Sequence, residues 1–466
     1  MILKNFFTNS FGILTSRIFG LLRDLLSASI LGANIYSDIF FVAFKLPNLF
    51  RRVFAEGAFS QSFIPAFAKS TKKTIFSFKI FTKFFLFLLF LSLIVTLFSQ
   101  YITKIIALGF DEKTIEIASP LIAINFYYLP LIFCVTFFGS LLQYKNHFTT
   151  TAFSTALLNI ALIVALLLSK DLEKIEIVYA LSYGVVAGGL LQLLAHIIAL
   201  KSKGLLKIFK YGFLYRKKEI KKEEKSFLKS FLQAIVGNST PQISAFLDTA
   251  IASFLAYGSI SYLYYANRVF QLPLALFAIA LSVGVFPKIA RYIKLKDEKS
   301  ANRLFREGFW ILFFLLSLSS AVGIIFSSEI VKLLFERGAF TQKDTLESAK
   351  VLSMYLVGLI PFGLAKLFSL YLYATHNQKR AAKISLIALS VNVLLYALLV
   401  APLGVSGLAL ASSGGGIVLF ILSIHSFGVK KFLDIILCKK LYIYILAMAI
   451  LIPLLLYSKE IIDGYL

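Results

Sequence analysis

The sequence predicts an all-α polytopic membrane protein. Two observations lead to this fold class: an apolar composition broken into spanning runs, and an internal repeat of those runs. Of the 466 residues, 59% are hydrophobic and 48 are phenylalanine, and the mean hydropathy is +0.84. This composition is more apolar than a soluble domain requires. The repeat predicts two pseudo-symmetric six-helix lobes, followed by one or two additional C-terminal helices.

Thirteen apolar runs are long enough to cross a bilayer, which takes about 20 residues of helix. The first run is too long and too charged for a cleavable signal and is expected to stay in the mature protein. The spans are predicted at about 5–31, 38–67, 84–101, 115–144, 151–169, 176–200, 227–257, 262–287, 308–328, 348–375, 384–400, 404–424 and 441–457.

The basic residues indicate the orientation. With the N-terminus in the cytoplasm and alternating spans, 32 of the 48 Lys and Arg fall in cytoplasmic segments and 9 in extracytoplasmic ones. This asymmetry is the positive-inside signal. The net charge of +25 is therefore explained by topology and by attraction to anionic lipid, not by nucleic-acid binding. The predicted orientation has a cytoplasmic N-terminus and an extracytoplasmic C-terminus.

The chain is organised around residues 16–67, where two apolar helices carry charged side chains. A charge at the centre of a spanning helix costs roughly 2.5–3.5 kcal/mol on insertion scales, so it normally faces a partner or a wet cavity. The alternative is that these side chains snorkel to the headgroups. Arg17 and Arg51 lie too far from the helix ends for that, whereas Arg23 is nearer an end. The charged residues are Arg17, Arg23, Asp24, Asp38, Lys45, Arg51, Arg52 and Glu56.

Spacing places these residues on one side of each helix, because seven residues are nearly two full turns. The first helix carries two such pairs, and the second carries a stripe flanked by an amide and a carboxylate. The pairs are Ser16 with Arg23 and Arg17 with Asp24; the stripe is Asp38, Lys45 and Arg52, flanked by Asn48 and Glu56. Arg52 and Glu56 are also spaced for an ion pair. We interpret both stripes as the lining of a polar cavity.

A shift of 226 residues aligns the two halves. Gly32 falls on Gly258, and the segment that ends at Pro47 falls on the segment that ends at Pro273. Six spans per half keep both halves in the same orientation, an arrangement found in two-lobed transporters. The predicted divisions are an N-terminal lobe at 1–200, a basic cytoplasmic linker at 201–229, a C-terminal lobe at 230–428 and an additional transmembrane helix at 429–466.

The second half has fewer charges within its spans. Arg268 lies on the helix that the repeat aligns with the second, polar helix of the first half, and Asn267 and Gln271 lie beside it. Arg268 is expected to contribute a cation to the same cavity. Lys366 has two interpretations, a functional residue or a snorkelling one. Asp248 is as well suited to pairing with a cation as to binding an ion.

Motifs for chemistry are absent from the sequence. It has no G-x-x-x-x-G-K-[ST] loop, and its four histidines form no H-E-x-x-H motif. Cations, not acid or histidine constellations, occupy the middle of the spans. We therefore expect a transporter, not an enzyme, with no cofactor, no resident metal and no catalytic residue.

The residues described above resemble the MurJ (MviN) family of lipid II flippases, within the multidrug, oligosaccharidyl-lipid and polysaccharide exporter superfamily. The resemblance covers the whole chain and is most specific in SRIFGLLRD (16–24) and SDIFFVAFKLPNLFRRVFAEGAFSQSFIP (37–65). It implies two lobes forming a V around a cationic central cavity, and two extra C-terminal helices that form a groove for the lipid tail. It also implies that transport requires Ser16, Arg17, Arg23, Asp38, Arg51 and Arg268.

The chain departs from this family in three places. Asn267 stands where members commonly have Asp, and only one predicted span follows the twelve-helix core, so the second groove helix is missing or unaccounted for. Some members have a sodium site, to which Asp248 and Asn392 are weak candidates. Tyr396 replaces the carboxylate expected a turn after Asn392, so sodium coupling is not predicted.

The resemblance implies a flippase for lipid II, the undecaprenyl-pyrophosphate-linked peptidoglycan precursor. Such a protein moves lipid II from the cytoplasmic to the outer leaflet of the bacterial inner membrane by alternating access. The alternative is a flippase for another lipid-linked oligosaccharide, of the O-antigen or capsule type. A rival from a different class is a membrane enzyme such as a lipid-linked glycosyltransferase or phosphatase. Expected partners are lipid II, the membrane and proteins of cell-wall synthesis. The substrate-binding residues are predicted to be Ser16, Arg17, Arg23, Asp24, Asp38, Asn48, Arg51, Arg52, Glu56 and Arg268.

Overall fold

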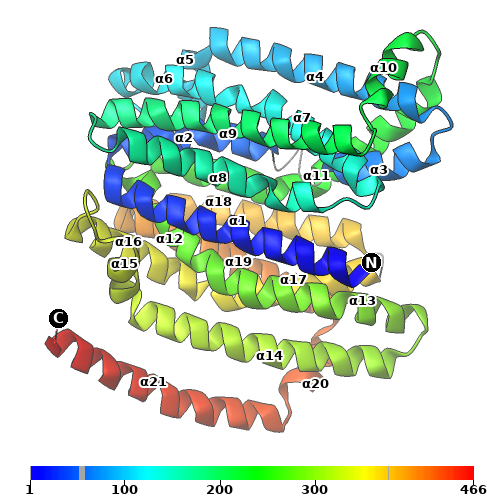
Figure 1. The fold of residues 1–466 in the computed structure, drawn as a ribbon. Helices are drawn as coiled ribbons and strands as arrows, with labels where there is room; N and C mark the ends of the chain where they lie inside the picture. The colour runs from blue at the N-terminus through cyan, green and yellow to red at the C-terminus, as the bar shows by residue number, and fades with distance from the viewer. Residues whose placement is uncertain (1, 52–57, 376, 466) are drawn as a thin grey trace. The chain divides into compact units, whose positions relative to one another are not determined.

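The computed structural model describes residues 2–51, 58–375 and 377–465. These residues form α-helices and one short π-helix, with no β-strand among them, which confirms the predicted all-α class (Figure 1). The helices of the first half are α1 (Ile2–Leu31), α2 (Ile35–Phe50), α3 (Ala58–Lys69), α4 (Lys73–Leu97), α5 (Ser99–Ile106), α6 (Glu112–Phe126), α7 (Tyr128–Tyr144), α8 (Thr149–Ser169) and α9 (Lys174–Ser202).

A short helix in the linker, α10 (Lys207–Leu214), leads into the second half of the chain. The helices that follow are α11 (Lys221–Ala252), α12 (Ser259–Pro273), η2 (Leu274–Ile279), α13 (Ala280–Lys294), α14 (Glu298–Ile325), α15 (Ser327–Phe335), α16 (Gln342–Val357), α17 (Leu359–Ala374), α18 (Gln378–Leu403), α19 (Val405–Phe427), α20 (Val429–Ile436) and α21 (Lys439–Tyr465).

The order of helices repeats, as the sequence predicts: α1–α9 correspond one by one to α11–α19. Gly32 and Gly258, which the 226-residue shift aligns, both have positive φ angles, of +73° and +95°. Such angles strain any residue with a Cβ, so glycine is required at both turns. Pro47 and Pro273 both lie inside helices, and the π-helix η2 begins directly after Pro273. A proline removes a backbone donor, which explains why the regular helix changes there.

The chain divides into two compact units. Unit 1 contains Met1–Ser261 and Arg337–Phe340, and unit 2 contains Tyr262–Glu336 and Thr341–Leu466. Both α10 and α11 therefore belong to unit 1. The lobe boundaries predicted from the repeat and the basic linker stay a prediction.

Unit 1 is held together by a cluster of phenylalanine rings from α3, α7 and α11. Phe59 packs against Phe133 at 5.3 Å between ring centroids, and Phe63 packs against Phe137 at 5.0 Å. Phe227 of α11 contacts Phe59 at 5.7 Å. Each of these rings is almost fully buried, and burying a ring of this size contributes about 1.5–3 kcal/mol.

Unit 2 has a similar aromatic core, in which Phe305 and Phe368 of α14 and α17 meet Phe427 of α19 at 4.9 and 5.2 Å. The helix α21 lies along α14, where the Tyr444 hydroxyl donates to Ser317 Oγ at 3.0 Å. None of the apolar stretch of α21 is buried in the protein. This is the surface expected of a helix that faces lipid.

By length and composition, eight of the described helices could cross a membrane, or nine if the bent pair α16 and α17 is one span. These nine correspond to nine of the thirteen predicted spans. The other four predicted spans, at 5–31, 38–67, 227–257 and 262–287, are the first two of each half. They contain most of the intramembrane charges noted in the sequence. The count of thirteen spans stays a prediction.

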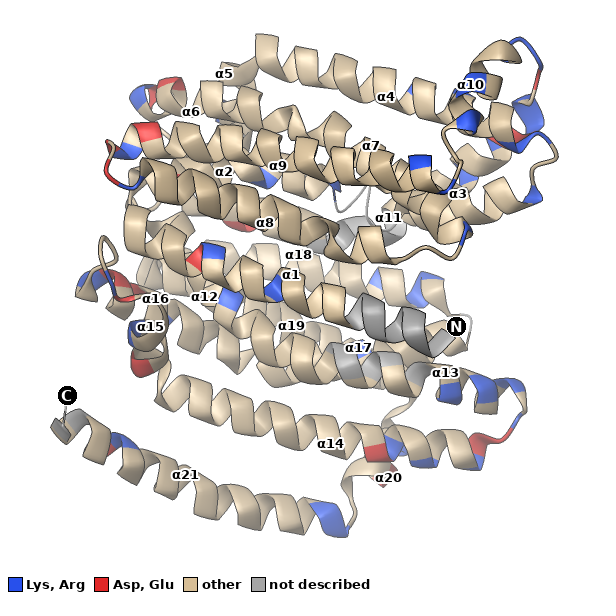
Figure 2. Ribbon diagram, viewed as in Figure 1, with Lys and Arg blue, Asp and Glu red and all other residues tan. Residues whose placement is uncertain are grey.

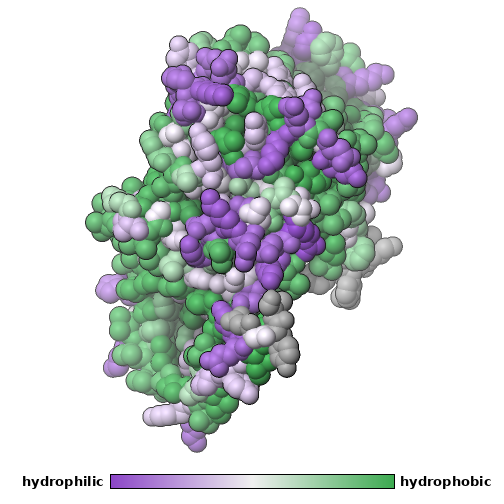
Figure 3. All heavy atoms as spheres, turned by 90° about the vertical axis from the view of Figure 1, so that its left-hand side faces the viewer, coloured by the Kyte–Doolittle hydropathy of each residue, from purple (hydrophilic) through white to green (hydrophobic). Residues whose placement is uncertain are grey.

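Charged residues gather at the ends of the helices and in the turns, and few lie along the helix middles (Figure 2). The view of the helix ends in Figure 3 shows hydrophilic side chains over those ends and hydrophobic side chains on the flanks. This distribution suits a bundle whose flanks contact lipid and whose ends contact water.

Candidate functional site

A buried polar network joins α1 to α8. The guanidinium of Arg23 donates to Asp24 Oδ1 from Nη2 at 2.5 Å and from Nε at 3.1 Å, and to Asn159 Oδ1 from Nη1 at 3.0 Å. Asn159 in turn donates to the carbonyl oxygen of Ser16 at 3.1 Å. Arg23 is 9% exposed and Asp24 is 3% exposed. A buried charge is tolerated where it is paired and hydrogen-bonded in this way.

Glycine allows α1 and α8 to approach closely enough for this network. A Cβ at Gly12 would lie 2.6 Å from the Ala152 Cβ, and one at Gly20 would lie 3.4 Å from Asn159 Nδ2. Ser16 Oγ donates to the Ala152 carbonyl at 3.4 Å. Three predicted site residues, Ser16, Arg23 and Asp24, are thus brought together by the packing of these two helices.

Arg17 differs from these neighbours because it is exposed on α1. Within the described residues, the structure records no hydrogen bond or ion pair for Arg17. Its guanidinium keeps all five donors for an anion. Arg17 is therefore the predicted residue of α1 that is best placed to bind a ligand.

On α2, Arg51 and Asn48 lie one turn apart and contact each other. Arg51 Nε donates to Asn48 Oδ1 at 2.9 Å, and both side chains are half-buried. Arg52 and Glu56, together with their predicted ion pair, lie outside the described residues. Lys45, the remaining cation of the stripe, is half-buried and has an interaction partner.

Asp38 is buried at the first turn of α2, where its carboxylate accepts three hydrogen bonds from the start of α12. Oδ2 accepts from the Gly258 N–H at 2.7 Å, and Oδ1 accepts from the Ser261 N–H at 2.8 Å and the Ser261 hydroxyl at 2.6 Å. Asp38 thus acts as a capping carboxylate for a helix more than 200 residues away in the chain. A negative charge at a helix N-terminus is stabilising. The predicted contact of Asp38 with substrate stays a prediction.

Arg268 lies half-buried on α12 in unit 2. Its Nη2 donates to the Tyr264 hydroxyl at 2.7 Å, and its guanidinium carbon lies 4.8 Å from the centre of the Tyr264 ring. Stacking and hydrogen bonding to one ring fix the plane of the guanidinium. Beside it, Gln271 donates to Asn267, so the residue that replaces the family aspartate takes part in an amide pair.

The weak sodium candidates belong to different units: Asp248 lies on α11 in unit 1 and Asn392 on α18 in unit 2. Asn392 Nδ2 donates to the Tyr396 hydroxyl at 2.9 Å. Among the described residues, no group of three or more His, Cys, Asp or Glu side chains could hold a metal ion. Lys366 is half-buried on α17, and no partner is recorded for it in the described part of the chain.

Three residues of these networks, Asn159, Ser261 and Tyr264, were not singled out by the sequence analysis. Asn159 is a single amide in the apolar run of α8, and such a residue usually pairs with a polar side chain of a neighbouring helix. That signal is visible in the sequence. Ser261 and Tyr264 have no comparable signal, because hydroxyl groups are common at helix starts and in aromatic runs.

The side chain of Asn159 is expected to contribute to stability. Asn159→Ala removes the acceptor for Arg23 Nη1 and the donor to Ser16, and it leaves a buried charge less satisfied. We expect a loss of about 1–3 kcal/mol, measured as a fall in the melting temperature of the purified protein. The matched control is Asn377→Ala, because Asn377 is exposed and makes no side-chain cap bond. An equal melting temperature for both variants would contradict the role of Asn159.

Two repeated sets of apolar helices, with a few cations held inside them, define a multi-pass membrane transporter. The chain matches the family model for the lipid II flippase MurJ over residues 27–463. It therefore belongs to the lipid II flippase MurJ family, within which peptidoglycan precursor transport is the named activity.

Similar proteins agree with this assignment. The chain is 51% identical to a probable lipid II flippase MurJ of Helicobacter pylori (strain ATCC 700392 / 26695), over 91% of this chain and 94% of that protein. It is 35% identical to a probable lipid II flippase MurJ of Haemophilus influenzae, over 86% and 81%. A solved structure of the lipid II flippase MurJ in an inward closed conformation matches with a TM-score of 0.79 at 27% identity, covering 98% of this chain and 97% of that one.

The fold extends beyond this family. An inward-facing multidrug resistance MATE family transporter of the MOP superfamily matches with a TM-score of 0.73 at 12% identity, over 89% of this chain and 94% of that one. At this identity the likeness concerns the fold alone.

Proposed function

We propose that this chain translocates lipid II from the cytoplasmic to the outer leaflet of a bacterial inner membrane by alternating access. The observation that carries the proposal is family membership over nearly the whole chain, because the match includes the charged helix α2 and both halves. The arginines described above supply the chemistry that a pyrophosphate-linked substrate requires.

Each unit contributes cations suited to a pyrophosphate. A guanidinium presents a planar fork of donors that binds phosphate oxygens bidentately, whereas an ammonium acts as a point charge. Arg17 and Arg51 in unit 1 and Arg268 in unit 2 are the proposed headgroup-binding residues. Asn48, Arg52 and Glu56 are proposed to belong to the same polar stripe on the second span.

The remaining predicted residues position the helices that carry these arginines. Arg23, Asp24 and Ser16 fix α1 against α8, which sets the direction in which Arg17 points. Asp38 fixes the start of α12, the helix that carries Arg268. No bond is made or broken in this process. The protein has only to bind the headgroup more tightly in one state than in another for the ligand to shift the equilibrium.

The function is tested in a bacterial strain depleted of its own lipid II flippase. Expression of this chain should restore growth and should return lipid II to the outer leaflet, where an added membrane-impermeant lipid II-degrading enzyme measures it. A strain that lacks an O-antigen or capsule flippase serves as the second arm. Restoration only in that arm would favour the flippase for another lipid-linked oligosaccharide.

The orientation is tested with reporter fusions, which the asymmetry of basic residues motivates. Fusions after Lys73, Lys222 and Lys299 should report a cytoplasmic location. Fusions at Asn34, at Ser259 and at the C-terminus should report an extracytoplasmic one. A cytoplasmic C-terminus would mean that the count of thirteen spans is wrong by one.

A further inference from the structure

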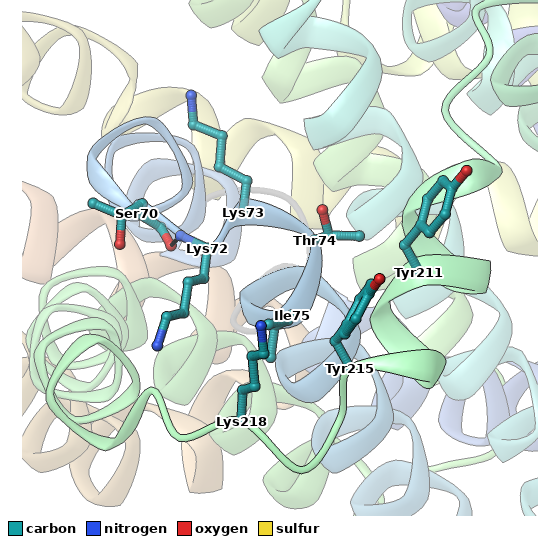
Figure 4. A pocket seen from close by; sticks show the side chains of 9 residues that line it. Ser70, Lys72, Lys73, Thr74, Ile75, Tyr211, Tyr215 and Lys218 are labelled. Atoms are coloured by element: carbon teal, nitrogen blue, oxygen red, sulfur yellow. Dashed lines mark hydrogen bonds between the residues drawn. The ribbon is translucent and has the colours of Figure 1, made fainter.

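A cavity of about 470 Å³ lies at the start of α4, and its lining contains none of the arginines of the proposed transport site. One wall is formed by residues 70–75, which include the turn between α3 and α4. The other wall is formed by α10 and the turn after it, through Tyr211, Tyr215 and Lys218. Figure 4 shows these side chains around the opening. The cavity belongs entirely to unit 1.

The lining is cationic. Lys72 and Lys218 approach from the two walls, and none of the three lining lysines forms an ion pair with the described residues (Figure 4). Lys73 points away from the other two, because its Nζ donates to the Tyr144 hydroxyl at 2.9 Å and lies over that ring. Lys72 Nζ donates to the Glu219 carbonyl at 3.4 Å, and Lys218 Nζ lies 5.1 Å from the centre of the Tyr215 ring. An ammonium has three donors, so both lysines keep donors for an anion in the cavity.

The carboxylates near the cavity have other partners. Glu223 accepts a hydrogen bond from Ser70 Oγ at 2.8 Å, and Glu219 pairs with Lys221 at 3.0 Å. The N-cap residue of α4, Lys72, makes no side-chain cap bond. The residues that line the cavity include three lysines and no carboxylate, and neither Lys72 nor Lys218 forms an ion pair within the described part of the chain. The lining therefore favours a negatively charged ligand.

The α10 wall also carries apolar groups directed outward. Phe213, Leu214 and Tyr215 are each more than half exposed. The opposite side of α10 is fixed, since Phe209 packs against Phe81 at 5.1 Å and a Cβ at Gly212 would lie 2.4 Å from the Phe78 Cβ. A short helix with exposed aromatic and aliphatic side chains beside lysines is typical of the membrane interface.

We propose that this cavity binds the phosphate headgroup of an anionic phospholipid in the cytoplasmic leaflet, with the acyl chains along the exposed apolar face of α10. Lys72 and Lys218 attract the phosphate, and Thr74, Tyr211 and Tyr215 offer hydroxyl groups to its oxygens and to the glycerol. The volume lies within the range of small-molecule sites. The leaflet assignment rests on the proposed orientation, and the binding of the headgroup does not.

The test is native mass spectrometry of the full chain extracted from vesicles of equal parts phosphatidylglycerol and phosphatidylcholine. The unmodified chain should retain phosphatidylglycerol preferentially. Lys72→Gln/Lys218→Gln should weaken this retention about 30-fold, from the attraction that two lysines near an anionic surface supply. Lys72→Arg/Lys218→Arg should restore it, because the positive charge remains.

The matched control is Lys217→Gln/Lys222→Gln, which removes the same charge from exposed positions that do not line the cavity. Equal loss in the control would show a general charge effect and overturn the site. A second arm offers inorganic phosphate to the lipid-free chain. Binding with the same lysine dependence would show a site for free phosphate and overturn the lipid assignment. Neither arm contains lipid II, so failure of the phospholipid site would leave the proposed transport function untouched, and the reverse also holds.

Discussion

Replacing Arg17, Arg51 or Arg268 with alanine is expected to abolish growth of a flippase-depleted strain while the protein stays in the membrane. Each guanidinium is proposed to bind the pyrophosphate, and losing one partner of a desolvated, hydrogen-bonded charge pair costs about 2–5 kcal/mol. This corresponds to a loss in affinity of roughly 30-fold or more. Growth, outer-leaflet lipid II and the amount of membrane protein are measured for each variant.

Lysine variants at the same three positions should give partial growth, because an ammonium keeps the charge without the bidentate fork. The control is Arg303→Ala. Arg303 pairs with Glu307 at 3.1 Å, but its side chain is 78% exposed, and such pairs contribute about 0–1 kcal/mol. Normal growth with Arg17→Ala would remove that residue from the binding site. Reduced growth with Arg303→Ala would mean that the assay responds to the loss of any arginine, and not to the loss of a binding residue.

The structure changes how the charges of the spans balance. If Asp38 is counted but no other charge within the first three residues of a span, the predicted spans contain seven cations and four carboxylates, and the sequence alone leaves open which of them pair. Asp24 pairs with Arg23. Asp38 instead directs its charge to the Gly258 and Ser261 donors. Its carboxylate is therefore committed to a helix terminus, so the count of four overstates the carboxylates that face cations.

Helical periodicity predicted which residues share a face of α1 but not how deeply each side chain is buried. Ser16 and Arg23, seven residues apart, both contact α8 as expected. Arg17 and Asp24 have the same spacing, yet Arg17 is exposed and Asp24 is buried. Asp24 is buried because the Arg23 guanidinium folds over it with two hydrogen bonds. A period fixes direction around a helix, whereas burial depends on the neighbouring side chains.

The repeat predicted more than composition did. It aligned Gly32 with Gly258, which both have positive φ angles, and Pro47 with Pro273, which lie within α2 and α12. It could not predict that Asp38 contacts the start of α12, because that contact joins residues more than 200 positions apart. The composition of residues 201–229 predicts a basic linker, and the structure places the short helix α10 within it. The cavity beside it depends on the packing of α10 against α4, which no local pattern encodes.

Replacing Asp38 with alanine is expected to destabilise the protein strongly. The variant leaves the Gly258 N–H, the Ser261 N–H and the Ser261 hydroxyl without their acceptor in a buried place. Each buried unsatisfied donor costs about 1–3 kcal/mol, so we expect a total loss of about 3 kcal/mol or more. Asp38→Asn should be intermediate, because its amide oxygen still accepts from Ser261 while its amide nitrogen opposes the Gly258 donor. The melting temperature and the membrane level of each variant are measured by fluorescence-detected size exclusion.

The control for Asp38 is another capping carboxylate that is fully in water. Asp297 accepts from the Ser300 N–H at 3.0 Å at the start of α14. Hydrogen bonds from Ser300, first from its side chain and then from its backbone, hold the pKa of the Asp297 carboxyl below its usual value. Asp297→Ala should lower the melting temperature only slightly, because this side chain is exposed to water, and its contribution should disappear as the pH falls through the lowered pKa, where protonation removes the charge. If Asp38→Ala instead melts like the unmodified protein and only growth is lost, Asp38 acts on the substrate and not as the cap of α12. A melting temperature well below that of Asp297→Ala, with partial recovery in Asp38→Asn, is the result that the capping geometry requires.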